Sequence, residues 1–174
     1  NFVIFCDGNP IFIDAGVGTY TARTFNSERY TIWSMRSEYH NLPTVNGIDQ
    51  RPGRQYASKN AQFDEDTGKL TLDLSAAYHP DAAISEYFRS AVIEDGKAIV
   101  CDELTSKKDG SVTFNLLCNA EPQNIEKGSF TIHGKTVKFD ERLSFDIDSP
   151  DCSWTETQTI PASWECKQLY RIKL

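Results

Sequence analysis

The sequence lacks several features that would assign it to a class at once. It has a single methionine in 174 residues and no apolar run near the roughly 20 residues of a membrane-spanning helix. It contains no C-x-x-C pair, the spacing common in zinc and redox motifs. No signal-peptide pattern precedes the first strand, and we expect any export signal to lie upstream of Asn1. We therefore predict no membrane span and no C-x-x-C metal or redox site.

An excess of basic charge is also missing. The formal net charge is -7, the sequence pI is about 4.9, and no basic run is longer than the pair Lys107–Lys108. A protein that binds nucleic acid needs a basic surface to neutralise phosphates, so we predict no nucleic-acid partner. A polyanionic sugar would also be repelled by the net charge, unless it met a local cluster such as Arg51, Arg54 and Lys59.

The five cysteines cannot all pair, because their number is odd. Cys6, Cys101 and Cys118 lie within apolar strand patterns, so we expect buried free thiols at these positions. For Cys152 and Cys166, the sequence leaves open whether they form a disulfide.

Short strand patterns dominate what the chain does contain. Asp-Gly turns at Asp7–Gly8, Asp95–Gly96 and Asp109–Gly110 are flanked by apolar alternation, which is a strong hairpin signal. We predict an all-β fold, an antiparallel β-sandwich of two or more stacked sheets, forming a single domain over residues 1–174. The predicted strands are Phe2–Cys6, Pro10–Asp14, Leu70–Ala77, Ser85–Ile93, Ala98–Leu104, Val112–Cys118, Ser129–His133, Thr136–Phe139, Leu143–Asp146 and Cys166–Lys173.

One long segment, Gly16–Gln62, fits neither strand nor helix periodicity. It is polar and rich in glycine, aromatic and basic residues. Long irregular loops in compact domains are more often functional than random. Helical patterns are restricted to single turns near Pro80–Ala83 and Arg29–Ser37.

Few residues in the sequence have side chains suited to chemistry. Of the three histidines, His133 precedes a turn glycine and His79 ends a strand, where structural roles are expected, whereas His40 lies in the irregular segment, next to Asn41. Asp14 ends the apolar run "IFIDAG", where a carboxylate needs a partner, although a turn-forming role would also explain it. Carboxylate and imidazole are suitable zinc ligands, but zinc usually takes at least three ligands from protein.

Three stretches carry a resemblance to a known family. They are "NFVIFCDGNPIFIDAGVGTY", "ERYTIWSMRSEYHNLPTVNG" and "AAYHPDAAISEYFRSAVIEDGKAIVCDEL". In their order, and in a D-A-G turn followed by Tyr and later by His-Asn, they resemble the β-sheet domain of the heparinase II/III polysaccharide lyases. The resemblance implies an antiparallel β-sandwich that follows an N-terminal helical toroid, with the active site in the cleft between them.

The same resemblance implies a metal site. In that family a segment of the form H-x-H or H-x-D, which carries a catalytic His and in several members a zinc ligand, lies just before the residues that match Asn1 and Phe2. Asp14 and His40 match the other two ligands of a chiefly structural zinc site. We therefore expect this chain to be a fragment that lacks the toroid, with low zinc occupancy when it is isolated.

The lyase chemistry defines which further residues to seek. β-Elimination removes the C5 proton of a uronic acid, so it needs a base, an acid for the leaving oxygen, and neutralisation of the carboxylate. The resemblance implies a tyrosine from the loop after the D-A-G turn, for which Tyr30 and Tyr20 are the candidates, with Tyr30 preferred because it lies nearer His40. For substrate contacts we select Arg51 and Arg54, because guanidinium groups match carboxylate and sulfate geometry, and Asn41, which follows His40.

Two functional hypotheses follow. The first is the β domain of a periplasmic or secreted lyase that acts on an acidic polysaccharide together with a helical toroid of the same protein, and that is inactive alone. The second is a non-catalytic β-sandwich that binds carbohydrate or serves a structural role. The sequence does not specify the glycan, the choice between endo and exo cleavage, or the oligomeric state.

Overall fold

The computed structural model of the protein describes all residues 1–174. The chain forms two compact units. Unit 1 comprises Asn1–Pro43 and Thr113–Leu174, and unit 2 comprises Thr44–Val112. The chain passes between the units within β3 (Pro43–Val45) and near the start of β8 (Val112–Cys118). The prediction of a single domain over residues 1–174 stays a prediction.

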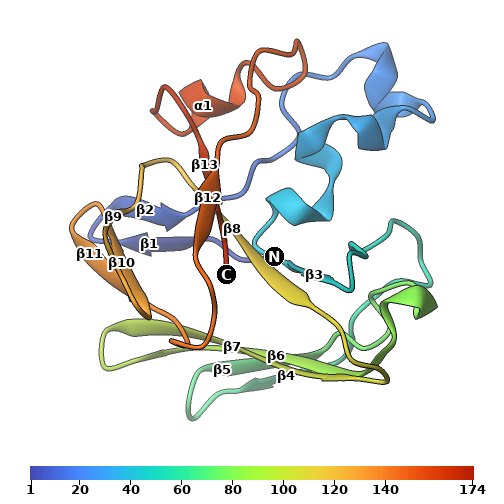
Figure 1. Cartoon of the computed structure of the whole chain (residues 1–174), viewed down its shortest axis with the longest axis vertical. Coiled ribbons are helices and arrows are strands. Elements are labelled where there is room, and N and C mark those ends of the chain that lie inside the picture. Colours follow the sequence, from blue (N-terminus) through green and yellow to red (C-terminus); the bar gives the residue numbers. More distant parts are fainter. The chain divides into compact units, whose positions relative to one another are not determined.

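Unit 1 is built from three antiparallel sheets, seen in Figure 1. A two-stranded sheet pairs β1 with β2, a three-stranded sheet has the order β11-β10-β9, and a third has the order β12-β13-β8 with β3 at its edge. In the third sheet Ile172 of β13 lies opposite Leu116 of β8. The bounds are β1 Ile4–Cys6, β2 Asn9–Phe12, β9 Gln123–Glu126, β10 Ser129–Ile132, β11 Lys135–Lys138, β12 Asp146–Asp148 and β13 Tyr170–Lys173.

The hairpin of β1 and β2 forms where the sequence predicted a tight turn. Asp7 and Gly8 have φ values of 49° and 78°, so both adopt the left-handed conformation that a type I′ turn requires. Glycine adopts this conformation without steric cost, and aspartate tolerates it better than most residues. The turn therefore aligns β2 with β1 and leads the chain towards Asp14.

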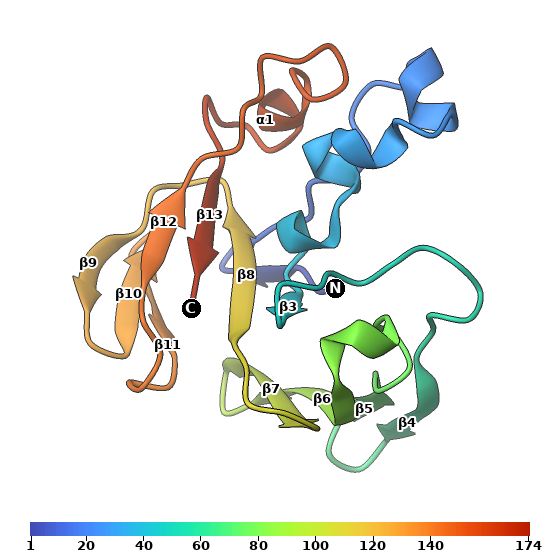
Figure 2. The same ribbon diagram turned by 45° about the vertical axis from the view of Figure 1, so that its right-hand side comes forward.

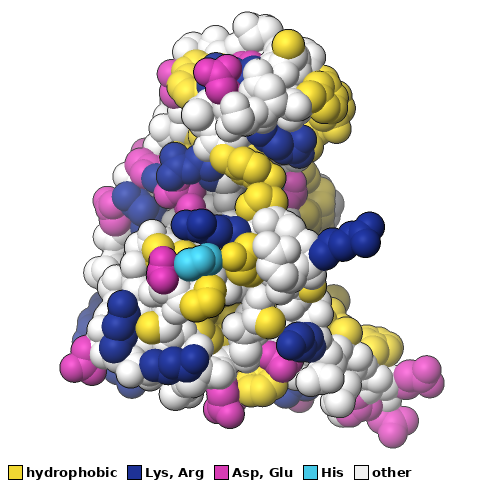
Figure 3. All heavy atoms as spheres, turned by 90° about the vertical axis from the view of Figure 1, so that its right-hand side faces the viewer, with side chains coloured by type: hydrophobic (Ala, Val, Ile, Leu, Met, Phe, Trp, Pro, Cys, Tyr) yellow, Lys and Arg dark blue, Asp and Glu magenta, His cyan; other side chains and the backbone are white.

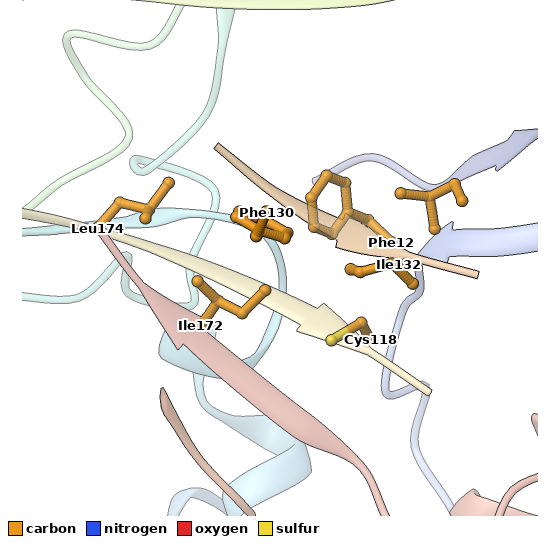
Figure 4. Packing of buried hydrophobic residues seen from close by; sticks show 7 residues of the cluster. Phe12, Cys118, Phe130, Ile132, Ile172 and Leu174 are labelled. Atoms are coloured by element: carbon orange, nitrogen blue, oxygen red, sulfur yellow. The ribbon is translucent and has the colours of Figure 1, made fainter. Parts of the chain in front are cut away.

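Side chains from all three sheets of unit 1 enclose one core, which Figure 4 shows at close range. Phe12 comes from β2, Cys118 from β8, Phe130 and Ile132 from β10, and Ile172 from β13. Phe130 and Ile132 are fully buried, and each such side chain contributes about 2 kcal/mol relative to an exposed position. This shared core makes unit 1 an antiparallel sandwich.

A second apolar cluster of unit 1 supports the irregular segment that follows β2. It contains Ile13, Ala15, Trp33, Leu117, Ile160 and Leu169. The part of the segment in unit 1 contains four short 3-10 turns, η1 (Ala22–Phe25), η2 (Arg29–Thr31), η3 (Trp33–Met35) and η4 (Ser37–Tyr39), and its remainder, in unit 2, includes most of β4. The part in unit 1 lies beside the C-terminal segment that carries the single α-helix, α1 (Ile160–Ser163), as Figure 2 shows. Its backbone is therefore held by the sandwich.

Unit 2 is a four-stranded antiparallel sheet of order β4-β5-β6-β7. Its elements are β4 Lys59–Asp64, β5 Lys69–Asp73, the 3-10 turn η5 Pro80–Ala82, β6 Ile84–Glu94 and β7 Lys97–Ser106. The β6–β7 hairpin turns at Asp95–Gly96, as the sequence predicted. A cluster around Val45, Tyr78 and Tyr87 forms the core of this unit.

A buried ion pair crosses from β6 to β7. Arg89 donates from Nε and Nη2 to the two carboxylate oxygens of Asp102, at 2.7 and 2.8 Å, and Tyr87 Oη donates to the same carboxylate at 2.8 Å. The side chains of Arg89 and Asp102 are only 8% and 10% exposed. Burial raises the pKa of the Tyr87 hydroxyl far above its usual range, so this group stays protonated and able to donate. The buried Asp102 carboxylate thus accepts hydrogen bonds from both other groups, and its charge is paired with that of Arg89.

The all-β antiparallel prediction is confirmed, with corrections in detail. Strands β4 and β9 were not predicted, because both are polar and exposed and carry no alternating apolar signal. The predicted strand Leu143–Asp146 is wrong, since β12 begins only at Asp146. Asp109–Gly110 forms no hairpin, because β8 pairs with β13 instead of β7.

The cysteines also differ in part from expectation. All five are free thiols, including Cys152 and Cys166. Cys118 is buried as predicted, but Cys101 is exposed. Cys101 lies opposite Ser90, on the face of the sheet away from Arg89 and Asp102. No helix of the protein has the length and apolar character needed to cross a membrane.

The buried ion pair generates a stability prediction. Asp102→Ala leaves the Arg89 charge buried without its partner, so we expect a loss of about 3 kcal/mol in the free energy of unfolding. The matched control is Asp140→Ala, which removes an exposed carboxylate paired with Arg142 and should leave stability nearly unchanged. Urea denaturation measures both. Equal effects of the two substitutions would contradict the role assigned to the pair.

Candidate functional site

Asp14 and His40, which lie 26 positions apart in the sequence, are in direct contact in unit 1. Asp14 follows the end of β2, and His40 is the residue at which η4 ends. His40 Nδ1 lies 3.0 Å from Asp14 Oδ2. The two side chains are 20% and 29% exposed, so the contact is partly shielded but open to solvent on one side.

The second nitrogen of the His40 ring is also engaged. Nε2 lies 2.7 Å from the backbone carbonyl oxygen of Ser34. A carbonyl oxygen only accepts, so Nε2 carries the proton of this hydrogen bond. Histidine ligands of metals usually donate their other ring N–H to a carbonyl or carboxylate, which fixes the orientation of the ring. His40 is therefore oriented with Nδ1 towards Asp14.

Asp14 is held as a carboxylate. Burial raises its pKa, but the hydrogen bond and charge of His40, the backbone N–H of Gly16 and the α-amino group of Asn1 together outweigh burial and lower the pKa below its ordinary value. Gly16 N donates to Asp14 Oδ1 at 2.6 Å. One oxygen thus receives a local backbone bond, and the other faces His40.

Asn1 also lies at this site. Its side-chain Nδ2 donates to Asp14 Oδ2, and its amino group is close enough for its charge to act on the Asp14 carboxylate. A residue joined to the amino group of Asn1 would therefore start beside the Asp14–His40 pair. Sequence reasoning did not identify Asn1 as part of the site.

Asn41 is buried beneath the pair and is fully engaged by the backbone. Its Nδ2 donates to the carbonyl oxygens of Phe2 and Ile13 at 2.7 and 2.8 Å, and its Oδ1 accepts from Leu117 N at 2.7 Å. The residue is 1% exposed. The sequence suggests Asn41 for substrate contact, but the structure directs its side chain inward, where it links the residues before β1, the residue after β2 and strand β8.

Two further residues that the sequence did not single out position the site. Trp164 Nε1 donates to the backbone carbonyl of Asp14 at 2.9 Å. Arg171 of β13 pairs with Glu38 at 2.9 Å, and its guanidinium lies 4.3 Å from the centre of the Tyr39 ring. Glu38 and Tyr39 belong to η4, which directly precedes His40, so Arg171 anchors the turn that presents the imidazole.

The same network includes an acidic partner in β12. Asp148 accepts from Nε and Nη2 of Arg171 at 2.9 and 2.6 Å. Burial alone would lower the pKa of Arg171, but the hydrogen bonds and charge of Asp148 raise it above its ordinary value. The guanidinium is thus a permanent cation held between strand and turn. No sequence signal connects these positions, because they meet only through the sheet.

The donor set at this place fits part of a zinc site. An imidazole nitrogen and a carboxylate oxygen face each other, and the imidazole has the outer hydrogen bond expected of a metal ligand. The chain has no group of three or more His, Cys, Asp or Glu side chains that could hold a metal ion. Asp14 and His40 alone are two ligands, fewer than the three that zinc usually takes from protein.

The other predicted site residues lie in different surroundings. Tyr30 and Tyr20 are 46% and 59% exposed in the segment that carries the 3-10 turns. The Tyr20 ring stacks on Phe25, and Arg29 lies 6.0 Å from the centre of the Tyr30 ring. Arg51 and Arg54 are exposed and belong to unit 2, so their role in substrate contact stays a prediction.

Comparison with known proteins assigns no family. No protein-family model matches the chain, and no curated protein matches it. Any function proposed for the protein therefore depends on the motifs and the geometry described above.

The role of Asn41 can be tested by substitution. Asn41→Ala removes an amide that makes three hydrogen bonds to buried backbone, so we expect a loss of about 3 kcal/mol in the free energy of unfolding. Asn124→Ala is the matched control, because Asn124 also has a positive φ, 48° against 38° for Asn41, but is exposed. An alanine at either position would adopt a positive φ, so the two substitutions introduce similar backbone strain. A loss no greater in Asn41→Ala than in the control would disprove the structural role.

Proposed function

We propose that this protein is the β domain of a polysaccharide lyase of the heparinase II/III type, which cleaves uronic-acid-containing glycans by β-elimination. The observation that supports the proposal most is the contact between Asp14 and His40, with the imidazole oriented by the Ser34 carbonyl. The motifs that resemble the family contain both residues. The proposal thus joins a sequence pattern to a geometry that the pattern alone does not guarantee.

The pair is proposed as two ligands of a zinc ion. When bound, the ion would supply a structural link between the end of β2 and the turn η4. The placement of Asn1 supports a third ligand from the segment just before it, because that segment would reach the pair directly. The H-x-H or H-x-D segment implied by the resemblance is of this kind.

The chemistry of β-elimination assigns the remaining roles. The base that removes the C5 proton, and most of the groups that neutralise the carboxylate, are proposed to come from a helical toroid of the same protein. Tyr30 is proposed as the acid that protonates the leaving glycosidic oxygen, since it is exposed on the same segment as His40 and its hydroxyl makes no hydrogen bond within the protein.

The protein is proposed to work outside the cytoplasm, in the periplasm or after secretion.

A non-catalytic carbohydrate-binding domain is the second candidate. The stacked, exposed rings of Tyr20 and Phe25 favour it, because such rings are suited to pack against sugars. This alternative requires no zinc and no toroid, so metal binding and product formation separate the two.

The zinc site is tested on the protein carrying the residues that precede Asn1. His40→Ala should weaken zinc binding by at least about 100-fold, because it removes a direct ligand, and Asp14→Asn should weaken it in the same direction. A competition titration with a chromophoric chelator measures the affinity. His133→Ala is the control, since this exposed turn residue lies outside the site and should leave the affinity unchanged. Zinc affinity that is unchanged in His40→Ala would refute the assignment.

Lyase activity is tested by the ultraviolet absorbance of unsaturated uronate. We expect the chain 1–174 alone to form no such product from heparan, alginate or chondroitin, and the full-length protein to form it from one of them. Tyr30→Phe in the full-length protein should reduce kcat by about 100-fold or more, because it removes the proton donor and keeps the ring. Tyr56→Phe, which changes a tyrosine outside the proposed site, is the matched control, and Tyr20→Phe tests the alternative acid.

Two results would count against this proposal. Turnover by the chain 1–174 alone would overturn the dependence on a toroid. A Tyr30→Phe variant with full activity, together with an inactive Tyr20→Phe variant, would move the acid to Tyr20.

A further inference from the structure

Two aromatic rings on the first 3-10 turn are held in an exposed position. Tyr20 precedes η1 and Phe25 ends it, and their rings stack with centres 5.5 Å apart and an angle of 22° between their planes. The residues are 59% and 74% exposed. Exposed aromatic rings present apolar area to solvent that can pack against a ligand.

The backbone beneath these rings is anchored to the C-terminal segment of unit 1. Thr19 N donates to the Glu156 carbonyl at 2.8 Å, and Thr21 Oγ1 donates to the Glu156 carboxylate at 2.8 Å. Gly18 lies so close to the backbone of Glu156 that a Cβ at this position would collide with the Glu156 carbonyl oxygen. The rings are therefore presented by a fixed backbone, which lowers the entropy lost when a ligand binds.

A cation lies on the same turn. Arg23 stands between Tyr20 and Phe25 in the sequence, and its guanidinium lies 4.8 Å from the centre of the Trp154 ring. Its Nε donates to Thr31 Oγ1 at 3.2 Å, whereas its two terminal nitrogens donate to no acceptor in the protein. The guanidinium is thus positioned by a ring and a hydroxyl, with its fork of donors available to a carboxylate.

The net charge of the protein does not favour an acidic ligand. The net charge is -7, and on the face in Figure 3 the Lys and Arg side chains are interspersed with Asp and Glu side chains. An acidic ligand would therefore need contacts besides charge. The pair of exposed rings supplies apolar stacking, and Arg23 supplies a local positive charge.

We propose that Tyr20, Phe25 and Arg23, which we name the aromatic platform, bind a uronic-acid-containing oligosaccharide. The apolar face of a sugar ring packs on the exposed rings, and the sugar carboxylate accepts hydrogen bonds from the terminal nitrogens of Arg23. This site deepens the proposed function, and the choice of an acidic glycan rests on that function. The site gives Tyr20 a role in binding, distinct from the role in catalysis proposed for Tyr30.

The test is calorimetric titration of the full-length protein carrying Tyr30→Phe, which slows cleavage of the probe, with an acidic oligosaccharide of alternating uronic acid and hexosamine. Phe25→Ala should weaken binding by about tenfold, because it removes one ring of the stack. Arg23→Gln should weaken binding of the acidic probe by a similar factor. It should leave binding of a carboxyl-reduced, neutral form of the probe unchanged, because that form lacks the carboxylate.

Conservative and distant variants control the test. Phe25→Trp keeps an aromatic ring and should retain most of the affinity. Arg23→Lys keeps the charge but lacks the fork of donors, so it should bind more tightly than Arg23→Gln and less tightly than the unchanged protein. Phe63→Ala removes another exposed ring, from unit 2, and Arg142→Gln removes an exposed guanidinium outside the platform. Both should bind the acidic probe as the unchanged protein does, and circular dichroism confirms that each variant is folded.

The outcomes separate this inference from the lyase proposal. Platform-dependent binding without product formation would support the platform and contradict the lyase. Product formation with unchanged binding in Phe25→Ala and Arg23→Gln would overturn the platform and leave the lyase standing. Equal affinity for the acidic and neutral probes would contradict the role of Arg23, and no binding of either probe would refute the platform as a whole.

Discussion

The hydrogen bonds of one buried amide, that of Asn41, hold the candidate site together. Asn41 directly follows His40, and its side chain donates to the carbonyl of Ile13, which directly precedes Asp14. The same amide accepts from the backbone of β8. Its backbone has φ 38°, a conformation that asparagine tolerates better than other residues with a side chain. Two chemically active side chains distant in the sequence are therefore in register because their neighbours share one amide.

A network of charged side chains also holds the turn that precedes His40. Arg171 lies in the final strand, is anchored by Asp148, and contacts Glu38 and Tyr39 immediately before His40. The turn that carries the imidazole thus connects to the sandwich through an amide and an ion-pair network. A rigid scaffold of this kind suits a site that must present ligands or rings in a fixed geometry. In the proposed enzyme, unit 1 supplies the zinc ligands and the sugar platform, and a toroid supplies the base.

How much the sequence could predict depended on the range of the interactions. Local signals were sufficient for the hairpin turns at Asp7–Gly8 and Asp95–Gly96, since turn chemistry lies within the turn itself. Asp14 was found because a carboxylate is unusual at the end of an apolar run, and His40 because it lies by the polar irregular segment and matches the family pattern. The structural role of Asn41 and the link to Arg171 could not be found, because they arise from contacts across many residues that leave no local pattern. The polar strands β4 and β9 were missed for the same reason. Their own residues carry no alternating apolar pattern, and they are strands because they pair with neighbouring strands.

The proposed function requires that His40 coordinates zinc through Nδ1 while Nε2 keeps its proton for the Ser34 carbonyl. Nitrogen-15 NMR of the imidazole in the full-length protein, recorded before and after zinc addition, distinguishes the two nitrogens. We expect the Nδ1 resonance to move to the range of a metal-bound nitrogen and Nε2 to remain protonated. Zinc that binds the protein while both His40 nitrogens keep their resonances would show that the imidazole is not a ligand.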